Sequence, residues 1–438
     1  MVPSFLKDAA NRGWKVARLD ALLKSKDILG HLDGNHGNLY PRSSEFVDSG
    51  IKYISANALI DGKVNLSKSK YLTHERGAQF KKGVAIDGDV LFAHNATVGP
   101  VALLTTNDDY VILSTSLTYY RCALDKVDNK YLVQYMASPA FVRQYEKIMK
   151  QTTRNQIPIT AQRDFYFVLP PLPEQRKIAQ TLSTWDKAIS TTEKLIDASK
   201  QQKKALMQQL LTGKKRLLDP ETGKAFEGEW EEFRLSTLSI KGKDNFTDGD
   251  WIESPYIADS GCRLIQTGNI GVGCFKNKAK KYISEASFVQ LKCKEVKVND
   301  LLICRLAEPA GRACVVPDIG ERKMLTSVDV TIMRVDKTKS SPEYLRYFFS
   351  LEHTLYTVTT LCGGSTRSRI SRTNLGRMKI LLPALNEQQK IVSVLTAADK
   401  EIELLEAKLA HFKQEKKALM QQLLTGKRRV KVTETEAA

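Results

Sequence analysis

The side chains in this sequence that are best suited to reading a ligand are planar hydrogen-bonding groups in two short stretches. The two stretches lie 213 residues apart and contain Arg154, Asn155 and Gln156, and Arg367, Ser368 and Arg369. Arginine can donate two hydrogen bonds to guanine, and asparagine or glutamine can pair with adenine. The stretches are therefore candidates for contacts to nucleic-acid bases. A structural role, or a contact to the nucleic-acid backbone, is the alternative.

Two more polar loops follow apolar stretches that are predicted to be strands. The candidate side chains in these loops are His94, Asn95 and Thr97 in the first, and Arg305 and Arg312 in the second. The polar residues differ between the loops, whereas the flanking glycines, Gly99 and Gly311, match. Different polar residues on one frame are what two domains reading different base sequences need. Ordinary sequence drift explains the difference as well.

Lysines gather in corresponding parts of the two halves and could contact phosphate. They are Lys68, Lys70, Lys81 and Lys82 in the first half, and Lys276, Lys278, Lys280 and Lys281 in the second. Lysine contacts to phosphate give affinity that depends on salt and carries no sequence information. The alternative for these residues is a solvated surface.

The usual catalytic and metal-binding motifs are missing. The fragment Thr222-Gly223-Lys224 lacks the first glycine and the hydroxyl of a phosphate-binding loop, so this sequence does not predict ATP hydrolysis. Leu169 and Leu172 flank two prolines where an amino-methyltransferase has a polar residue and an aromatic one. The seven cysteines include no C-x-x-C pair, and the six histidines form no H-E-x-x-H. We therefore predict no catalytic residue, no metal and no cofactor in this chain.

An internal repeat is the strongest feature of the sequence. Residues 203–214, KKALMQQLLTGK, recur unchanged at 416–427, and LPPLPEQRKI at 169–178 resembles LLPALNEQQKI at 381–391. A period of 213 residues indicates a duplicated domain, because solenoid repeats have periods of about 20 to 50 residues.

The net charge is shared between the two copies. The 438 residues include 67 Lys+Arg and 49 Asp+Glu, for a formal charge of +18, of which residues 1–219 carry +11 and residues 220–438 carry +7. Two basic halves suggest two contacts to one polyanion, although the charge could also serve solubility alone. No run of about 18 apolar residues or signal-peptide core is present, so we expect a cytoplasmic protein.

Two long helices with a heptad pattern are predicted within the repeat. Their apolar seam residues are Ile178, Leu182, Trp185, Ile189, Ile196, Leu206 and Leu210 in the first helix, and Ile391, Leu395, Ile402, Leu405, Leu409, Phe412, Leu419 and Leu423 in the second. A period of 3.5 residues favours a coiled coil. We expect the two helices to pair with each other within the chain. A homodimeric coiled coil is the alternative.

The ends of both helices are marked by prolines and glycines. Prolines before each helix place Glu174 and Glu387 in the first turn, and Gly213 and Gly426 follow the last turn. Each helix then has about 40 residues and a length of roughly 60 Å. A lysine in each seam, at 203 and 416, could fix the register.

The segments at about 14–168 and 230–380 contain short Val, Ile, Tyr and Phe runs broken by Gly, Asn and Asp. This punctuation is typical of strands joined by tight turns. Both segments become helical towards their ends, near 131–149 and 343–358. The predicted fold is of the α+β class, with two strand-rich domains alternating with two long helices.

The duplicated E-Q-x-K-I helix start and the duplicated L-M-Q-Q-L-L-T-G-K helix end resemble the specificity subunit of type I restriction-modification enzymes. The resemblance runs from Trp14 to Lys427. The departures are small: in the second copy, Ala384 and Asn386 replace prolines of the first. It implies target-recognition domains at 1–168 and 217–380. It also implies conserved helical regions at 169–216 and 381–427, and we expect a flexible tail at 428–438.

This family resemblance implies a noncatalytic subunit in a prokaryotic, nucleoid-associated complex. Each recognition domain would read one half of a bipartite double-stranded DNA target, and an antiparallel coiled coil would set the spacer. Successive major-groove faces recur about every 34 to 36 Å, so helices of roughly 60 Å could hold two readers one turn apart. Two methyltransferase subunits, with S-adenosylmethionine, and motor-nuclease subunits, with ATP and Mg, would be the partners. An orphan subunit that serves methylation only is the alternative.

Overall fold

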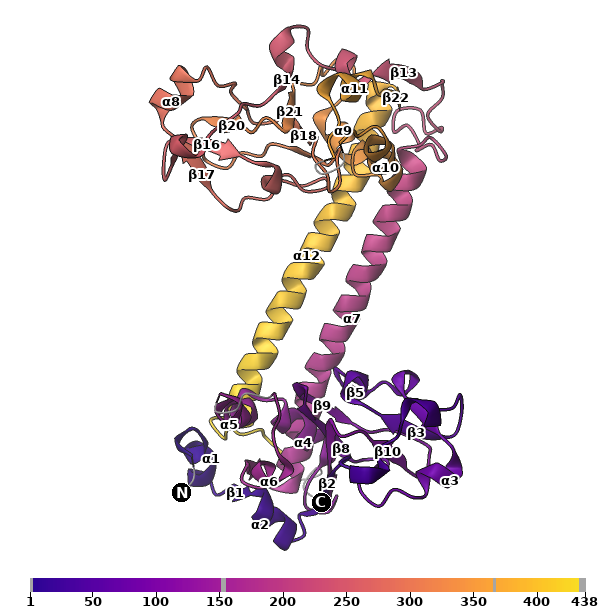
Figure 1. Cartoon of the computed structure of the whole chain (residues 1–438), viewed down its shortest axis with the longest axis vertical. Helices are drawn as coiled ribbons and strands as arrows, with labels where there is room; N and C mark the ends of the chain where they lie inside the picture. Colours follow the sequence, from indigo (N-terminus) through magenta and orange to yellow (C-terminus); the bar gives the residue numbers. More distant parts are fainter. Residues whose placement is uncertain (1–2, 151–154, 365–367, 433–438) are drawn as a thin grey trace. The chain divides into compact units, whose positions relative to one another are not determined.

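The computed structural model of the protein describes residues 3–150, 155–364 and 368–432. The chain divides into two compact units. Unit 1 contains Met1–Lys194 and Ala407–Ala438, and unit 2 contains Leu195–Glu406. The long helices α7 (Leu172–Leu210) and α12 (Leu385–Leu423) each contribute one part to each unit (Figure 1). The predicted α+β class, with strand-rich domains and two long helices, is confirmed.

Unit 1 contains twelve named strands and short helices around them, in the residues that the structure describes. The strands are β1 (Lys15–Arg18), β2 (Ile28–Asp33), β3 (Ile51–Ile54), β4 (Leu59–Ile60), β5 (Gly62–Val64), β6 (Lys70–Leu72), β7 (Val84–Ala85), β8 (Val90–Asn95), β9 (Thr97–Leu103), β10 (Val111–Leu113), β11 (Leu117–Cys122) and β12 (Tyr166–Leu169). The helices before α7 are α1 (Lys7–Asn11), α2 (Leu19–Lys24), α3 (His74–Gly77), α4 (Asn129–Met136), α5 (Pro139–Met149) and α6 (Ile159–Gln162).

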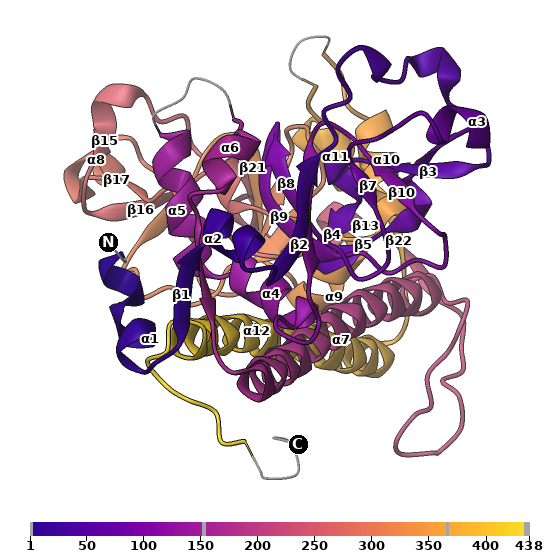
Figure 2. The ribbon, with the colours of Figure 1, turned by 90° about the horizontal axis from the view of Figure 1, so that it is seen from below.

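The strands of unit 1 form three sheets, in the orders β2-β11-β8-β9-β5-β4, β6-β3-β10-β7 and β1-β12. Strand β8 is buried along almost its whole length, because apolar clusters cover both of its faces. Helix α4 lies between the strands β8 and β9 and the helix α7 (Figures 1 and 2). This layer connects the sheet that carries the candidate loops to the long helix.

Unit 2 repeats this arrangement with shorter strands. Its strands are β13 (Glu231–Arg234), β14 (Phe246–Asp248), β15 (Ile257–Ala258), β16 (Cys262–Ile265), β17 (Lys281–Ile283), β18 (Leu301–Cys304), β19 (Ala313–Val315), β20 (Met324–Thr326), β21 (Val330–Met333) and β22 (Lys379–Leu382). Its helices besides α7 and α12 are α8 (Glu285–Gln290), α9 (Pro342–Phe348), α10 (Glu352–Thr360) and α11 (Arg372–Arg377).

The central strands of the sheets in unit 2 match those of unit 1, whereas β4 and β5 at the edge of the large sheet of unit 1 have no named counterpart in the described part of unit 2. The order β14-β21-β18-β19 corresponds to β2-β11-β8-β9, and the pair β13-β22 corresponds to β1-β12. The parallel pair β16-β20 likewise corresponds to the parallel pair β3-β10. The predicted domain duplication is therefore present in the fold as well as in the sequence.

The long helices pair antiparallel within each unit. In unit 1, Glu193 of α7 pairs with Lys413 of α12 at 2.7 Å, and the Trp185 and Phe412 rings meet edge to face at 5.7 Å. In unit 2, Lys200 of α7 pairs with Glu406 at 2.6 Å. Every predicted seam residue is buried or half-buried, so the predicted pairing of the helices within the chain is confirmed.

The glycines at the helix ends adopt the geometry that their positions predict. Gly213 has φ +71° and Gly426 has φ +76°, both in the left-handed region that favours glycine. The chain that follows α12 continues to pack. Arg429 pairs with Glu174, and Val430 contacts the core of unit 1. These two residues therefore pack against unit 1, although we expected a flexible tail from residue 428 onwards.

The described residues contain neither a metal-binding cluster nor a membrane-spanning helix. Within the described residues, no group of three or more His, Cys, Asp and Glu side chains could hold a metal ion, and the cysteines are all free. None of the helices in the same residues is long and apolar enough to cross a membrane.

Candidate nucleic-acid interface

In unit 1, two loops that the sequence marked separately lie side by side. The Ile157 N–H donates to the His94 carbonyl at 2.8 Å, and the Ala96 N–H donates to the Asn155 carbonyl at 2.9 Å. Gln156 forms an antiparallel bridge with Asn95 between them. The end of β8 and the segment after α5 therefore form one short backbone ladder.

Unit 2 contains the same ladder at equivalent residues. The Ile370 N–H donates to the Arg305 carbonyl at 3.0 Å, and the Ala307 N–H donates to the Ser368 carbonyl at 3.1 Å. Arg369 bridges Leu306 in the position that Gln156 occupies in unit 1. Two of the predicted base contacts, Arg154 and Arg367, lie outside the described residues.

One predicted base contact in each unit faces the interior instead. His94 is buried, and its Nδ1–H lies 3.0 Å from the Ile157 carbonyl, while burial lowers the pKa of its imidazole. Arg305 is also buried, and it donates to the Ile370 carbonyl at 3.2 Å. Burial leaves neither side chain accessible for the direct DNA contact that we predicted. Their side-chain hydrogen bonds hold the ladder to the interior of each unit.

Arg312, also a predicted base contact, uses most of its guanidinium donors on backbone carbonyls. It donates to the carbonyls of Ile270, Leu306 and Pro309 at 2.9 to 3.0 Å, and to that of Thr267 at 3.2 Å. A side chain with four such hydrogen bonds has few donors left for a base. Arg312 therefore holds the loop between β18 and β19 in shape.

The matching glycines of the two loops are required by close packing. A Cβ atom on Gly99 would lie 2.9 Å from the Tyr145 hydroxyl of α5. A Cβ atom on Gly311 would lie 2.9 Å from Val358 of α10. The two contacts are equivalent in the repeat, so these glycines match for a structural reason.

The remaining candidates of the two ladders stay accessible. Thr97 and Asn155 are exposed in unit 1, and Asn95 and Gln156 are half-buried. In unit 2 Ser368 is half-buried and the Arg369 side chain is 48% exposed. These side chains can still reach a ligand.

The lysines of unit 1 are exposed around the four-stranded sheet. Lys68 ends a short turn before β6, Lys70 begins β6 with its ammonium 4.6 Å from the Phe46 ring centroid, and Lys81 and Lys82 precede β7. Their chemistry suits phosphate, and no buried partner neutralises them among the residues described.

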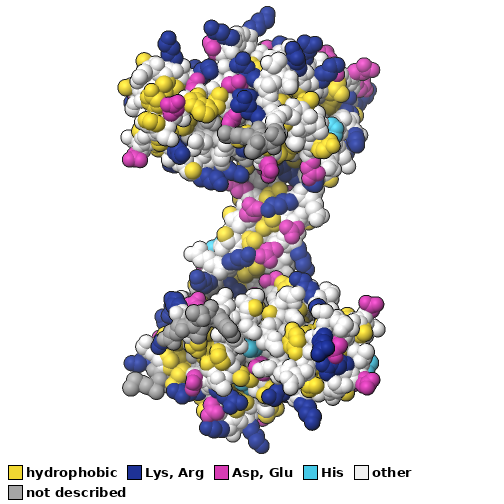
Figure 3. Space-filling model, viewed as in Figure 1, with side chains coloured by type: hydrophobic (Ala, Val, Ile, Leu, Met, Phe, Trp, Pro, Cys, Tyr) yellow, Lys and Arg dark blue, Asp and Glu magenta, His cyan; other side chains and the backbone are white. Residues whose placement is uncertain are grey.

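In unit 2, the lysine loop is held from inside by its backbone. The Asn269 amide donates to the carbonyls of Lys276 and Lys278 at 2.9 and 2.6 Å. Arg263, which is fully buried, lies 3.4 Å from the carbonyls of Lys278 and Lys281. Because the carbonyls point inwards, the side chains of Lys276, Lys278, Lys280 and Lys281 are exposed. Figure 3 shows Lys and Arg side chains over the visible face of each unit.

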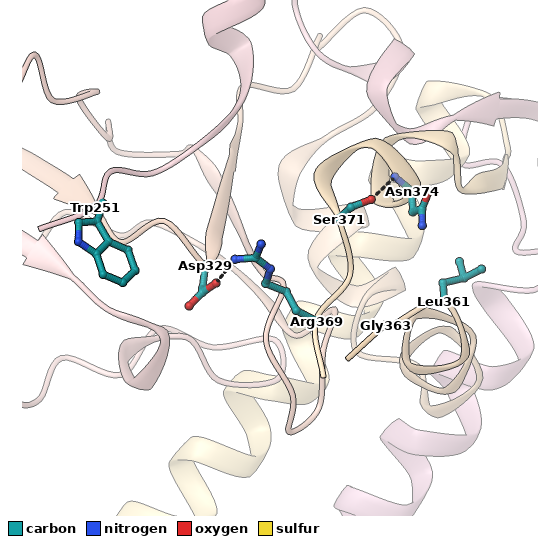
Figure 4. Close-up of a pocket in the computed structure, with 7 residues that line it drawn as sticks. All are labelled: Trp251, Asp329, Leu361, Gly363, Arg369, Ser371 and Asn374. Carbon is teal, nitrogen blue, oxygen red and sulfur yellow. Dashed lines mark hydrogen bonds and ion pairs between the residues drawn. The ribbon is translucent and has the colours of Figure 1, made fainter. Parts of the chain in front are cut away.

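A pocket of about 470 Å³ lies beside the ladder of unit 2 (Figure 4). Trp251, Asp329 and Arg369 line it together with Leu361, Gly363, Ser371 and Asn374. Sequence reasoning missed Trp251 and Asp329. The only signal was a tryptophan among polar residues outside any predicted strand.

Comparisons with known proteins identify the family of the chain. The family model of the type I restriction modification DNA specificity domain matches residues 11–200 and 228–414. The predicted specificity subunit of the type I restriction enzyme MjaX from Methanocaldococcus jannaschii is 26% identical over 385 residues, which cover 85% of each chain. The MjaVIII specificity subunit of the same organism is 27% identical over 271 residues, 60% of this chain and 62% of that protein.

Two solved structures share the fold. A chain from a study of complex assembly and conformational transition in a type I R-M system has a TM-score of 0.60 and 19% identity, covering 95% of this chain and 98% of its own. The HsdS subunit from Thermoanaerobacter tengcongensis has a TM-score of 0.52 and 19% identity, covering 95% and 97%. With the family match to both halves, the chain belongs to the DNA specificity subunits of type I restriction-modification enzymes.

Proposed function

We propose that each unit carries one DNA reader and that each reader binds one half of a bipartite target. Reader 1 is residues 14–168 and reader 2 is residues 230–380. The observation that carries this proposal is the repeated ladder, which holds Gln156 in one reader and Arg369 at the equivalent place in the other. One frame with two different polar groups suits two different base sequences.

The exposed lysines supply the affinity that does not depend on sequence. Lys278, Lys280 and Lys281 lie in one loop whose carbonyls are held inside the protein, and the lysines around β6 and β7 serve reader 1 in the same way. Changing these three residues of reader 2 to alanine should weaken binding to DNA of any sequence. The slope of log affinity against log salt should fall by up to about 3, because each lost phosphate contact removes about 0.9. An unchanged slope would mean that the three lysines form a solvated surface and make no phosphate contacts.

The long helices serve protein partners and spacing in this proposal. Exposed acidic and basic side chains alternate along them, as in the pairs Lys200–Glu406 and Lys413–Glu193. We infer that the outer faces of the helices bind two methyltransferase subunits, which carry S-adenosylmethionine, and that the helices set the spacer between half-sites. Motor-nuclease subunits with ATP and Mg would complete the restriction enzyme.

Exchanging one reader tests the proposal. Residues 14–168 are replaced by the corresponding segment of another family member, and the chain is expressed with its methyltransferase in a host that lacks other methylation. Sequencing that detects methylated adenine then reports the target. One half of the target should change, while the other half and the spacer remain.

The matched control exchanges residues 230–380 and should change the other half only. A target whose two halves both change after a single exchange would contradict the assignment of one reader to each half.

A further inference from the structure

Arg369 in reader 2 is held in one orientation by a carboxylate and by its own backbone. Its Nη1 atom lies 3.0 Å from Oδ1 of Asp329, whose side chain is only 11% exposed. Its N–H donates to the Gly363 carbonyl at 3.0 Å, and its carbonyl accepts from the Gly363 N–H at 3.1 Å. A guanidinium with its backbone and one nitrogen fixed presents its other donors in a defined direction.

The ion pair makes Arg369 better suited to a base than to a phosphate. Asp329 offsets the positive charge that a phosphate contact needs, but leaves N–H groups of the guanidinium fork available. Apart from the bond to Asp329, the Arg369 side chain makes no hydrogen bond to another described residue. The N7 and O6 atoms of guanine are two adjacent acceptors, which a pair of arginine donors fits.

Trp251 lines the same pocket and is 69% exposed. In Figure 4, Asp329 lies between the Trp251 ring and the Arg369 side chain. A large aromatic ring that remains exposed beside a hydrogen-bonding group offers a flat apolar contact, such as the methyl group of thymine requires. The pocket therefore combines one polar and one apolar element of base recognition.

Reader 1 lacks the arginine–aspartate pair at the equivalent positions. Gln156 replaces Arg369 on the ladder. Ser116 replaces Asp329, because the His94 N–H donates to the Ser116 carbonyl at 2.9 Å as the Arg305 N–H donates to the Asp329 carbonyl at 2.8 Å. A neutral amide beside a neutral hydroxyl suits adenine rather than guanine.

We propose that Arg369, oriented by Asp329, reads a guanine in the half-site of reader 2, and that Trp251 contacts the base next to it. This inference rests on the proposed function, since it assigns one base of the half-site that reader 2 binds. Arg369 is the base-contacting residue and Asp329 is a positioning residue.

The experiment compares the target of the unchanged chain with that of Arg369→Gln and Arg369→Lys, each in complex with the methyltransferase. The half-site of reader 2 should contain a guanine, and both variants should lose about 10- to 100-fold of the preference for it, measured as the ratio of affinities for duplexes with and without that guanine. Arg369→Lys keeps the charge but not the planar fork, so its overall affinity should fall less than its preference.

Asp329→Asn should lower the same preference by a smaller factor, about 3- to 10-fold, since the fork remains but is no longer held. Lys379→Gln is the matched control, because Lys379 pairs with Glu232 at 2.8 Å on β22 and the change removes one positive charge from the same unit. Its target should be unchanged.

Three results separate this inference from the proposed function. An unchanged target that still requires guanine in both Arg369 variants overturns the inference alone, as does a reader 2 half-site without guanine. A wild-type target that is not bipartite overturns the proposed function, and the inference with it.

Discussion

Units 1 and 2 fix their readers to the long helices with the same contacts, but they differ where a base would be read. Glu174 at the start of α7 is buried and pairs with Arg429, and Glu387 at the start of α12 is buried and pairs with Arg216. The two glutamates are 213 residues apart in the sequence, and so are the two arginines. These equivalent ion pairs show that the start of each long helix is held in the same way in both units.

A buried glutamine near the start of each long helix also makes equivalent contacts in the two units. Gln175 donates to the carbonyls of Pro170 and Lys126 at 2.8 and 3.0 Å, and Gln388 makes the two equivalent bonds, both at 3.0 Å. In contrast, Gln156 and Arg369 occupy one ladder position with different chemistry. These frame contacts are kept between the copies, whereas the side chain at this ladder position differs.

The units also differ in buried histidine, which gives the largest expected effect. His31 in β2 is buried, and burial lowers its pKa to about 4, while Phe246 takes its place in β14. Below pH 6.5 the unfolded chain binds a proton that the folded unit refuses, so the stability of unit 1 falls as the pH drops from about 6.5 to 4. The loss from His31 reaches about 3 kcal/mol. Burial lowers the pKa values of His36 and His94 as well.

Urea unfolding at pH 7.5 and pH 5, followed by proteolysis and mass spectrometry of peptides from each unit, measures this difference. His31→Phe is the control, because Gln162 keeps its bond from the Tyr120 hydroxyl at 2.7 Å. The variant should lose part of the acid sensitivity of unit 1. An equal loss of stability in unit 2, whose histidine at 353 is exposed, would break the comparison.

The ion pairs at the helix starts give an effect of intermediate size. The Arg216 side chain is 25% exposed and also donates to the Gly228 carbonyl at 3.0 Å, whereas the Arg429 side chain is 47% exposed. Arg216→Ala should cost unit 2 about 2 to 3 kcal/mol, because it leaves the buried Glu387 carboxylate unpaired. Arg429→Ala should cost unit 1 about 1 kcal/mol.

The same unfolding experiment reports both costs. Adding Glu387→Gln to Arg216→Ala should recover part of the stability, since no unpaired charge then remains. Failure to recover any would mean that Arg216 acts through packing and its bond to Gly228 alone.

The smallest effect concerns the carboxylates that join the readers to the seam lysines. Asp186 pairs with Lys416 and accepts from the Gln134 amide at 2.7 Å, whereas Asp399 pairs with Lys203 and accepts from the Tyr347 hydroxyl at 2.6 Å. Changing either aspartate to asparagine should cost about 1 kcal/mol in its own unit. Because Arg346 also lies 3.7 Å from Asp399, that change should cost slightly more. A double-mutant cycle of Asp399→Asn with Lys203→Met measures the coupling, and a coupling of zero would contradict the pair.

The elements that were predicted correctly have periodic or repeated sequences. The heptads predicted the seam, prolines and glycines predicted the helix ends, and short Val and Ile runs predicted the strands. These signals are local, so the sequence alone is sufficient to recognise them.

The direction of single side chains was not predictable in the same way. Strand β8 is covered on both faces and shifts register between Phe92 and His94, so alternation does not tell which residues face inwards. The burial of His94 could not be predicted for this reason. Arg305 follows β18, which apolar clusters also cover on both faces. The pocket with Trp251 was missed because loops and a helix that are far apart in the sequence assemble it.

The most direct test of the account is the target of a chain that carries reader 2 twice. Residues 14–168 are replaced by residues 230–380, and methylated adenines are mapped in the host genome with the methyltransferase present. Since the frame contacts of the two units are equivalent, both halves of the target should become the reader 2 half-site. A target that keeps two different halves would contradict the claim that each reader alone determines one half.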